Sequence, residues 1–155
     1  MMKKIKILLI EDDRKKSDDI VNYIVTNFPN SSIELKESYH SGLKSLIKDS
    51  YDLLLLDMSM PTWDRSPVEN GGDYEKFGGI KILKELGRKK RLLPTILITM
   101  FDNFGESDNS ITLDQMDAVL KSDYNEAYVG SVFYRSDISQ WENDLNLLMS
   151  KIQND

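Results

Sequence analysis

The sequence contains no cysteine. This excludes disulfide bridges, thiolate nucleophiles and thiolate-bound metals, and it is the usage expected of a protein in a reducing compartment. We therefore expect a cytoplasmic protein. Histidine is almost as scarce, since His40 is the only one. His40 lies near the start of a predicted helix and far along the chain from the acidic motifs, which favours a surface role, and no histidine phosphotransfer motif is evident.

Long apolar runs are also missing, because no stretch approaches the roughly 20 residues that a transmembrane helix needs. The N-terminal stretch MMKKIKILLIEDD resembles a signal peptide in its basic and apolar parts. Three acidic residues interrupt it and no small-residue cleavage site follows, so we interpret it as a first strand.

The net charge of −6 disfavours nucleic acids and anionic membranes as general partners. One basic cluster, at residues 87–91, follows a helical pattern. Positive charge complements the C-terminus of a helix, and we prefer this interpretation of the cluster to nucleic-acid binding.

Short apolar runs alternate with helix-periodic segments along the 155 residues, which predicts one α/β domain over residues 1–155. Strands that are buried on both faces and separated by helices imply a doubly wound, five-stranded parallel sheet with helices on both faces. Two long loops, at about 59–78 and 100–110, are expected to be functional or disordered. The predicted strands are 5–10, 32–36, 53–56, 95–99 and 128–134, and the predicted helices are 16–27, 41–49, 79–88, 112–122 and 138–152.

Acidic side chains follow two of these strands. Glu11-Asp12-Asp13 come after the first strand, Asp57 after the third, and Thr99 ends the fourth. The carboxyl ends of parallel strands meet at one edge of a sheet, where open α/β folds bind ligands. Clustered carboxylates would repel one another without a cation, and such oxygen ligands suit Mg2+. The alternative is that these acids are solvated helix caps, which we favour for one acid but not for several in register.

The ordered motifs KILLIEDD, LLLLDMSMP and PTILIT, with the spacing from Asp12 to Asp57, resemble the receiver domain of two-component response regulators (the CheY-like superfamily) over about residues 3–150. The resemblance implies a flavodoxin-like fold of the receiver type. It also implies that Asp57 accepts a phosphoryl group from a histidine kinase or a phosphotransfer protein, as part of a phosphorelay. Glu11, Asp12, Asp57 and the backbone carbonyl of Ser59 would hold Mg2+, and Thr99 would hydrogen-bond a phosphoryl oxygen and draw its loop inward.

The chain departs from the family pattern at the end of its last strand, where the family places a lysine followed by proline. Here Tyr134 takes the lysine position and Arg135 the proline position. Arg135 would need a twist or bulge to reach the site, and Lys121 is a looser candidate. We expect that no residue replaces the lysine and that the switch is weakened or altered.

Other positions also differ from the family pattern. Met100 stands where a small residue is usual and could crowd the phosphoryl pocket, and Ser131 stands at the position of the aromatic switch residue. Activation could therefore be transmitted through the long loops, with Trp63 a candidate; simple loop packing explains Trp63 equally well.

Three functions compete. The first is a stand-alone receiver without an output domain, which is not an enzyme and signals by contacting another protein through its fourth helix, fifth strand and fifth helix or through its long loops. The second is a pseudo-receiver that binds a partner independently of phosphorylation. The third is an aspartate-nucleophile phosphohydrolase, which we disfavour because Ser59 occupies the position of its second acid.

Overall fold

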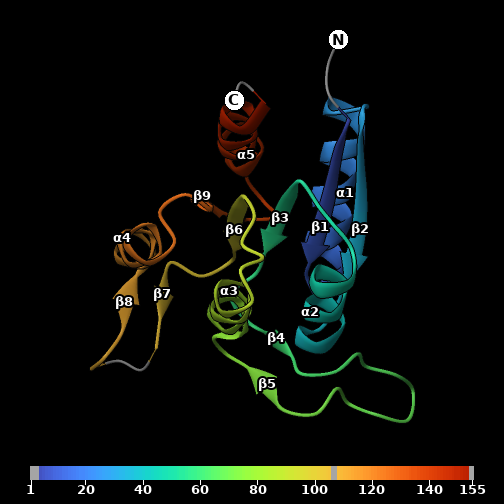
Figure 1. Cartoon of the computed structure of the whole chain (residues 1–155), viewed down its shortest axis with the longest axis vertical. Coiled ribbons are helices and arrows are strands. Elements are labelled where there is room, and N and C mark those ends of the chain that lie inside the picture. Colours follow the sequence, from blue (N-terminus) through green and yellow to red (C-terminus); the bar gives the residue numbers. More distant parts are fainter. Residues whose placement is uncertain (1–3, 106–107, 154–155) are drawn as a thin grey trace.

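The computed structural model describes residues 4–105 and 108–153, which contain a five-stranded parallel sheet (Figure 1). The strands lie in the order β2-β1-β3-β6-β9, and every neighbouring pair is parallel. The order confirms the predicted doubly wound α/β fold. The strands are β1 (Ile5–Ile10), β2 (Ser31–Lys36), β3 (Leu53–Leu56), β6 (Thr95–Thr99) and β9 (Tyr128–Phe133).

Helices cover both faces of the sheet. One core cluster joins the sheet to α1 and α5, and a second joins it to α2, α3 and α4. The four leucines of β3 are all buried and divide between the clusters, with Leu53 and Leu55 in the first and Leu54 and Leu56 in the second. This alternation is why the run LLLL forms a central strand. The helices are α1 (Arg14–Asn27), α2 (Tyr39–Lys48), α3 (Gly78–Arg88), α4 (Leu113–Asp123) and α5 (Gln140–Gln153).

The predicted boundaries of these elements differ from the observed ones by at most two residues. The two predicted long loops, in contrast, contain antiparallel hairpins that the sequence did not indicate. Residues 59–78 hold β4 (Met60–Pro61) and β5 (Tyr74–Glu75), and residues 100–110 hold β7 (Asn103–Phe104) and β8 (Ile111–Thr112), the latter extending just past the predicted loop. Residues 106 and 107 of the second loop lie outside the described residues, as does Lys3. Both hairpins lie toward the end of the molecule to which the arrowheads of β1, β2 and β3 point (Figure 1).

None of the helices in the described ranges combines the length and apolar character that a membrane span requires.

The start of α3 lies very close to the residue that follows β3. The Gly79 N–H donates to the Met58 carbonyl at 2.8 Å, and a Cβ at Gly79 would lie 2.6 Å from the Asp57 carbonyl oxygen. We expect Gly79→Ala to lower the free energy of unfolding by about 1–3 kcal/mol, because the backbone after Asp57 must shift. Gly87→Ala is the control in the same helix, since its new Cβ would meet its nearest neighbours at 3.7 Å.

Urea unfolding of both variants tests this expectation. Gly87→Ala should be neutral or more stable by up to about 1 kcal/mol, as alanine favours the helix. Equal stability of the two variants would contradict the close contact at Asp57.

Candidate functional site

Three carboxylates meet at the carboxyl edge of the sheet. Glu11 and Asp12 follow β1, and Asp57 follows β3. One oxygen from each lies within 4.8 Å of the others, with Glu11 and Asp57 buried and Asp12 half-buried. The structure thus brings together the acids singled out in the sequence, except for Asp13, which has another task. Asp13 is the N-cap of α1, where its side chain accepts a hydrogen bond from the Lys16 backbone N–H at 2.9 Å.

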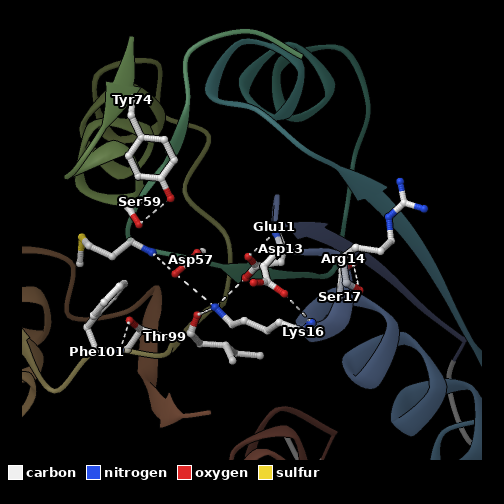
Figure 2. A network of polar contacts seen from close by, with 12 residues as sticks. Glu11, Asp13, Arg14, Lys16, Ser17, Asp57, Ser59, Tyr74, Thr99 and Phe101 are labelled. Atoms are coloured by element: carbon white, nitrogen blue, oxygen red, sulfur yellow. Dashed lines mark hydrogen bonds and ion pairs between the residues drawn. The ribbon is translucent and has the colours of Figure 1, made fainter. Parts of the chain in front are cut away.

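A buried lysine enters this cluster from the first turn of α1 (Figure 2). The side chain of Lys16 is fully buried, and its Nζ lies 2.6 Å from Glu11 Oε1 and 3.2 Å from Asp57 Oδ1. Nζ also donates to the Ile98 carbonyl at 2.7 Å. The ammonium therefore donates one hydrogen bond, to the Ile98 carbonyl, and forms ion pairs with Glu11 and Asp57. The sequence had indicated no cation at this place, and the structure puts the Lys16 ammonium of α1 beside Asp57.

The position of Lys16 on α1 explains its burial. Lys16, Ile20 and Ile24 are spaced by four residues, so they lie on the same side of the helix, and all three are buried. The neighbouring Lys15 faces outward and pairs with Asp19 at 3.0 Å. The Asp13 cap fixes where the helix starts, and this places Lys16 at the sheet end of the buried stripe.

Burial and charge act against each other in the cluster. Burial raises the pKa of the Glu11 carboxyl to about 8, against the opposing effect of Lys16, and the nearby Asp57 raises it further. Burial alone would lower the pKa of the Lys16 ammonium, but Asp57 and Glu11 together outweigh burial and raise it. Lys16 is therefore held as a cation, and the cluster favours positive charge in its centre.

The two oxygens of Asp57 have different surroundings. Oδ1 accepts a hydrogen bond from the Met58 N–H at 2.8 Å and faces Lys16 Nζ. Oδ2 accepts no hydrogen bond from any residue within the described ranges. Asp57 thus has one anchored oxygen and one that is available for a reaction.

The segment between β4 and β5 folds back over the cluster. Arg65 lies 3.3 Å from Asp12 Oδ2, and Asp64 accepts from the Ser41 hydroxyl at 2.9 Å. Trp63 packs on His40 with ring centroids 4.2 Å apart, although half of Trp63 remains exposed. The packing interpretation of Trp63 and the surface position of His40 both agree with the structure. Arg65 adds a second cation to the site that the sequence had not indicated.

Thr99 ends β6 and is fully buried beside the cluster. Its hydroxyl oxygen accepts a hydrogen bond from the Phe101 N–H at 3.1 Å. Met100 is exposed at the surface, as is Phe101. Thr99 is therefore linked to the start of the segment that leads into the β7–β8 hairpin.

Tyr134, at the family's lysine position, forms its hydroxyl hydrogen bond with α1 and not with the three clustered carboxylates. That hydroxyl donates to Asp19 on α1, and the ring packs against Trp141 with centroids 5.3 Å apart. Arg135 pairs with Asp137 at 2.9 Å. Within the described ranges, neither side chain forms a hydrogen bond or ion pair with Glu11, Asp12 or Asp57.

Lys121 and Ser131, both singled out in the sequence, lie on α4 and next to it, respectively. Lys121 is exposed in the last turn of α4. Ser131 on β9 donates to Asp117 of α4 at 2.7 Å, and Tyr128 donates to the same carboxylate. Ser131, which occupies the position of the family's aromatic switch residue, therefore takes part in a polar contact between β9 and α4.

A cavity of about 480 Å3 opens beside Asp57, between the two hairpins. Met58 and Ser59 line one side of it and Phe101 and Phe104 another, with Tyr74 also in the wall. The Ser59 hydroxyl lies 3.2 Å from the Tyr74 hydroxyl (Figure 2). The residues that follow β3 and β6 thus face an apolar opening at the protein surface.

The donor set fits Mg2+. Three carboxylates offer hard oxygen ligands within a small volume, and Glu11 Oε1 is buried with no hydrogen-bond partner among the described residues. That atom lies 2.6 Å from Lys16 Nζ, but as an ion pair rather than as an aligned hydrogen bond. A metal ion would therefore share these ligands with Lys16 and Arg65.

No protein-family model matches the chain. Several relatives match over most of their length, and two of them are described here. The chain is 30% identical over 140 residues to the uncharacterized protein y4jR of Sinorhizobium fredii, covering 88% of this chain and 91% of that protein. It is 28% identical over 142 residues to the Detocs response regulatory protein DtcB of Enterobacter cloacae, covering 90% of this chain and 95% of that one.

Solved structures share the fold. A response regulator receiver domain protein from Clostridium thermocellum superposes with a TM-score of 0.61 at 20% identity, covering 97% of this chain and 94% of that chain. The RcsB response regulator of Salmonella typhimurium gives a TM-score of 0.66 at 20% identity and covers 99% of this chain. This chain spans only 61% of the RcsB chain. At these identities the likeness concerns the fold alone.

Proposed function

Because the chain belongs to the receiver-domain family of response regulators, we propose that its Asp57 accepts a phosphoryl group and that the phosphorylated form signals through contacts with another protein. The observation that carries the proposal is the arrangement of Asp57. It lies at the open end of a buried strand, with Oδ1 anchored by Met58 and Lys16 and Oδ2 free. The donor would be a histidine kinase or a phosphotransfer protein.

In the proposed transfer, Asp57 acts as the nucleophile. Oδ2 attacks the phosphorus atom, a new O–P bond forms, and the bond from phosphorus to the nitrogen or oxygen of the donor breaks, its electron pair leaving with the donor. Asp57 gives up no proton in this step. A carboxylate is a weak nucleophile, so alignment and charge compensation supply most of the rate enhancement.

Glu11, Asp12, Asp57 and the backbone carbonyl of Ser59 would hold Mg2+. When bound, it would neutralise negative charge on the transferring group. The residues of the chain perform the remaining tasks. The apolar cavity lined by Met58 and Ser59 would receive part of a donor next to Asp57, and Lys16 and Thr99 would border the phosphoryl group.

The output would be a change of surface rather than catalysis. A phosphoryl oxygen near Thr99 would accept a hydrogen bond from the Thr99 hydroxyl and reorient that hydroxyl, whose oxygen accepts a hydrogen bond from the Phe101 N–H. Phe101 is exposed and leads into the β7–β8 hairpin, so such a change would alter a surface that a partner can contact. We therefore propose a non-enzymatic signalling module whose output partner binds near this hairpin.

A phosphorylation-independent binding module is the second candidate. The observation in its favour is that Lys16 and Arg65 already pair with all three carboxylates. Such pairing would hold one conformation without a phosphoryl group.

An intact-mass experiment separates the two candidates. The protein is incubated with Mg2+ and acetyl phosphate, alongside samples with chelator in place of metal. We expect one added phosphoryl group per chain, dependent on the metal. Since a small donor can fail where a kinase succeeds, the second arm adds beryllofluoride with Mg2+ and follows tryptophan fluorescence in a Trp141→Phe background. Neither an adduct nor binding at millimolar metal would favour the phosphorylation-independent module.

Tyr134→Phe tests whether the tyrosine acts in place of the family's lysine. Because its hydroxyl binds Asp19 and not the acid cluster, we expect phosphorylation within about twofold of wild type. The lost hydrogen bond to a carboxylate should lower the free energy of unfolding by roughly 1.5–3 kcal/mol at most. Phosphorylation rates and urea unfolding measure the two effects. A large loss of phosphorylation in a stably folded variant would show instead that Tyr134 takes part in phosphorylation.

A further inference from the structure

The Lys16 side chain is a cation in the centre of the site that no motif of the family assigns. It is fully buried, and its partners are two carboxylates and the Ile98 carbonyl. Burying an ammonium is costly unless it is paired and hydrogen-bonded, and here two carboxylates supply the opposite charge while the Ile98 carbonyl accepts a hydrogen bond. A lysine that served only to pack α1 against the sheet would not require two carboxylates beside its ammonium group.

No other cation in the described part of the chain contacts Asp57. Arg65 pairs with Asp12, Arg135 pairs with Asp137, and Lys121 is exposed on α4. Tyr134 carries no positive charge, and its hydroxyl binds Asp19. Positive charge at the phosphoacceptor therefore comes from α1.

The contact of Lys16 with Asp57 Oδ1 also helps to fix the orientation of the Asp57 carboxylate. Met58 N–H at 2.8 Å and Lys16 Nζ at 3.2 Å both approach Oδ1. A hydrogen bond and an ion pair on the same oxygen restrict rotation of the carboxylate, and they leave Oδ2 as the oxygen that can bond to phosphorus.

We propose that Lys16 positions Asp57 for attack through Oδ2 and then pairs with the phosphoryl group on the phosphorylated side chain. This inference rests on the proposed phosphoacceptor function. Phosphorylation increases the negative charge at this position, and an ammonium on a flexible stem can follow that charge while keeping its proton. The positive group of the site would thus be carried by the first helix rather than by the last strand.

Beryllofluoride, a mimic of the phosphoryl group, provides the test. Its dissociation constant is measured at saturating Mg2+ for wild type, Lys16→Met and the matched control Lys121→Met, with circular dichroism to verify the fold. We expect at least about tenfold weaker binding for Lys16→Met, as loss of a charge-assisted contact implies, and a change within twofold for Lys121→Met. Equal affinity of wild type and a folded Lys16→Met would overturn the proposal.

A second measurement needs no substitution, so it remains decisive if Lys16→Met does not fold. Nitrogen NMR of the lysine ammonium groups follows the Nζ signal of Lys16 as beryllofluoride is added. We expect this signal to shift while that of Lys121 does not, whereas an unmoved Lys16 signal in a protein that binds beryllofluoride would overturn the proposal. Wild-type protein that binds no beryllofluoride and forms no adduct would instead count against the proposed function itself.

Discussion

Lys16→Met is expected to lower the free energy of unfolding by about 3 kcal/mol when divalent metal is removed with chelator. The substitution leaves Glu11 and Asp57 buried and facing each other without a cation, and breaking a buried ion pair typically costs about 3–5 kcal/mol. We expect the lower end of this range because Glu11, whose pKa is already raised to about 8 chiefly by burial, can take up a proton. Urea unfolding in chelator measures the loss.

Two comparisons make that result specific. Lys121→Met exchanges the same residue types at an exposed position of α4 and should change stability by no more than about 0.5 kcal/mol. Added Mg2+ should recover part of the stability of Lys16→Met, since it would bind the same carboxylates. A loss below about 1 kcal/mol in chelator would show that the ion pairs contribute little.

Asp12→Asn is expected to weaken Mg2+ binding by at least about tenfold and to slow phosphorylation of Asp57 accordingly. Mg2+ prefers carboxylate oxygens, and changes around metal ligands alone commonly cost about 10–100-fold in affinity. The fold should tolerate the change, because the ion pair of Asp12 with Arg65 lies near the surface. Metal titration and phosphorylation rates measured over a range of Mg2+ concentrations provide the two readouts.

The neighbouring Asp13→Asn is the matched control. Asp13 lies outside the three-carboxylate cluster and caps α1, a position that asparagine fills as well as aspartate. Both variants remove one negative charge from adjacent residues, so a general effect of charge would lower the Mg2+ affinity of both to a similar extent. Similar Mg2+ affinities for the two variants would argue against Asp12 as a ligand.

The sheet and the acid cluster could be predicted from the sequence because each rests on a simple pattern. Strands buried on both faces are continuous apolar runs, such as the four leucines of β3, and the ends of parallel strands necessarily share one edge. The β4–β5 and β7–β8 hairpins could not be predicted in this way. Their strands are two residues long, too short to show any periodicity, and they lie within polar segments.

Lys16 was missed because a lysine in the first turn of a helix is ordinarily solvated. The signal that could have found it is its spacing of four from Ile20 and of eight from Ile24, which places it on the buried stripe of α1. Five residues after Glu11, a lysine on that stripe must point at the carboxylates at the sheet edge. The contact of Arg65 with Asp12 had no such signal, because it depends on how the β4–β5 segment folds back.

The measurement that tests the central claim most directly is chemical trapping of the phosphorylated residue. Protein treated with Mg2+ and acetyl phosphate is reduced with borohydride, which converts an acyl phosphate into homoserine, and the peptides are analysed by mass spectrometry. We expect homoserine at position 57 alone, and none in Asp57→Asn treated in the same way. Homoserine at another acidic residue, or a phosphoryl group that survives Asp57→Asn, would contradict the assignment of Asp57 as the phosphoacceptor.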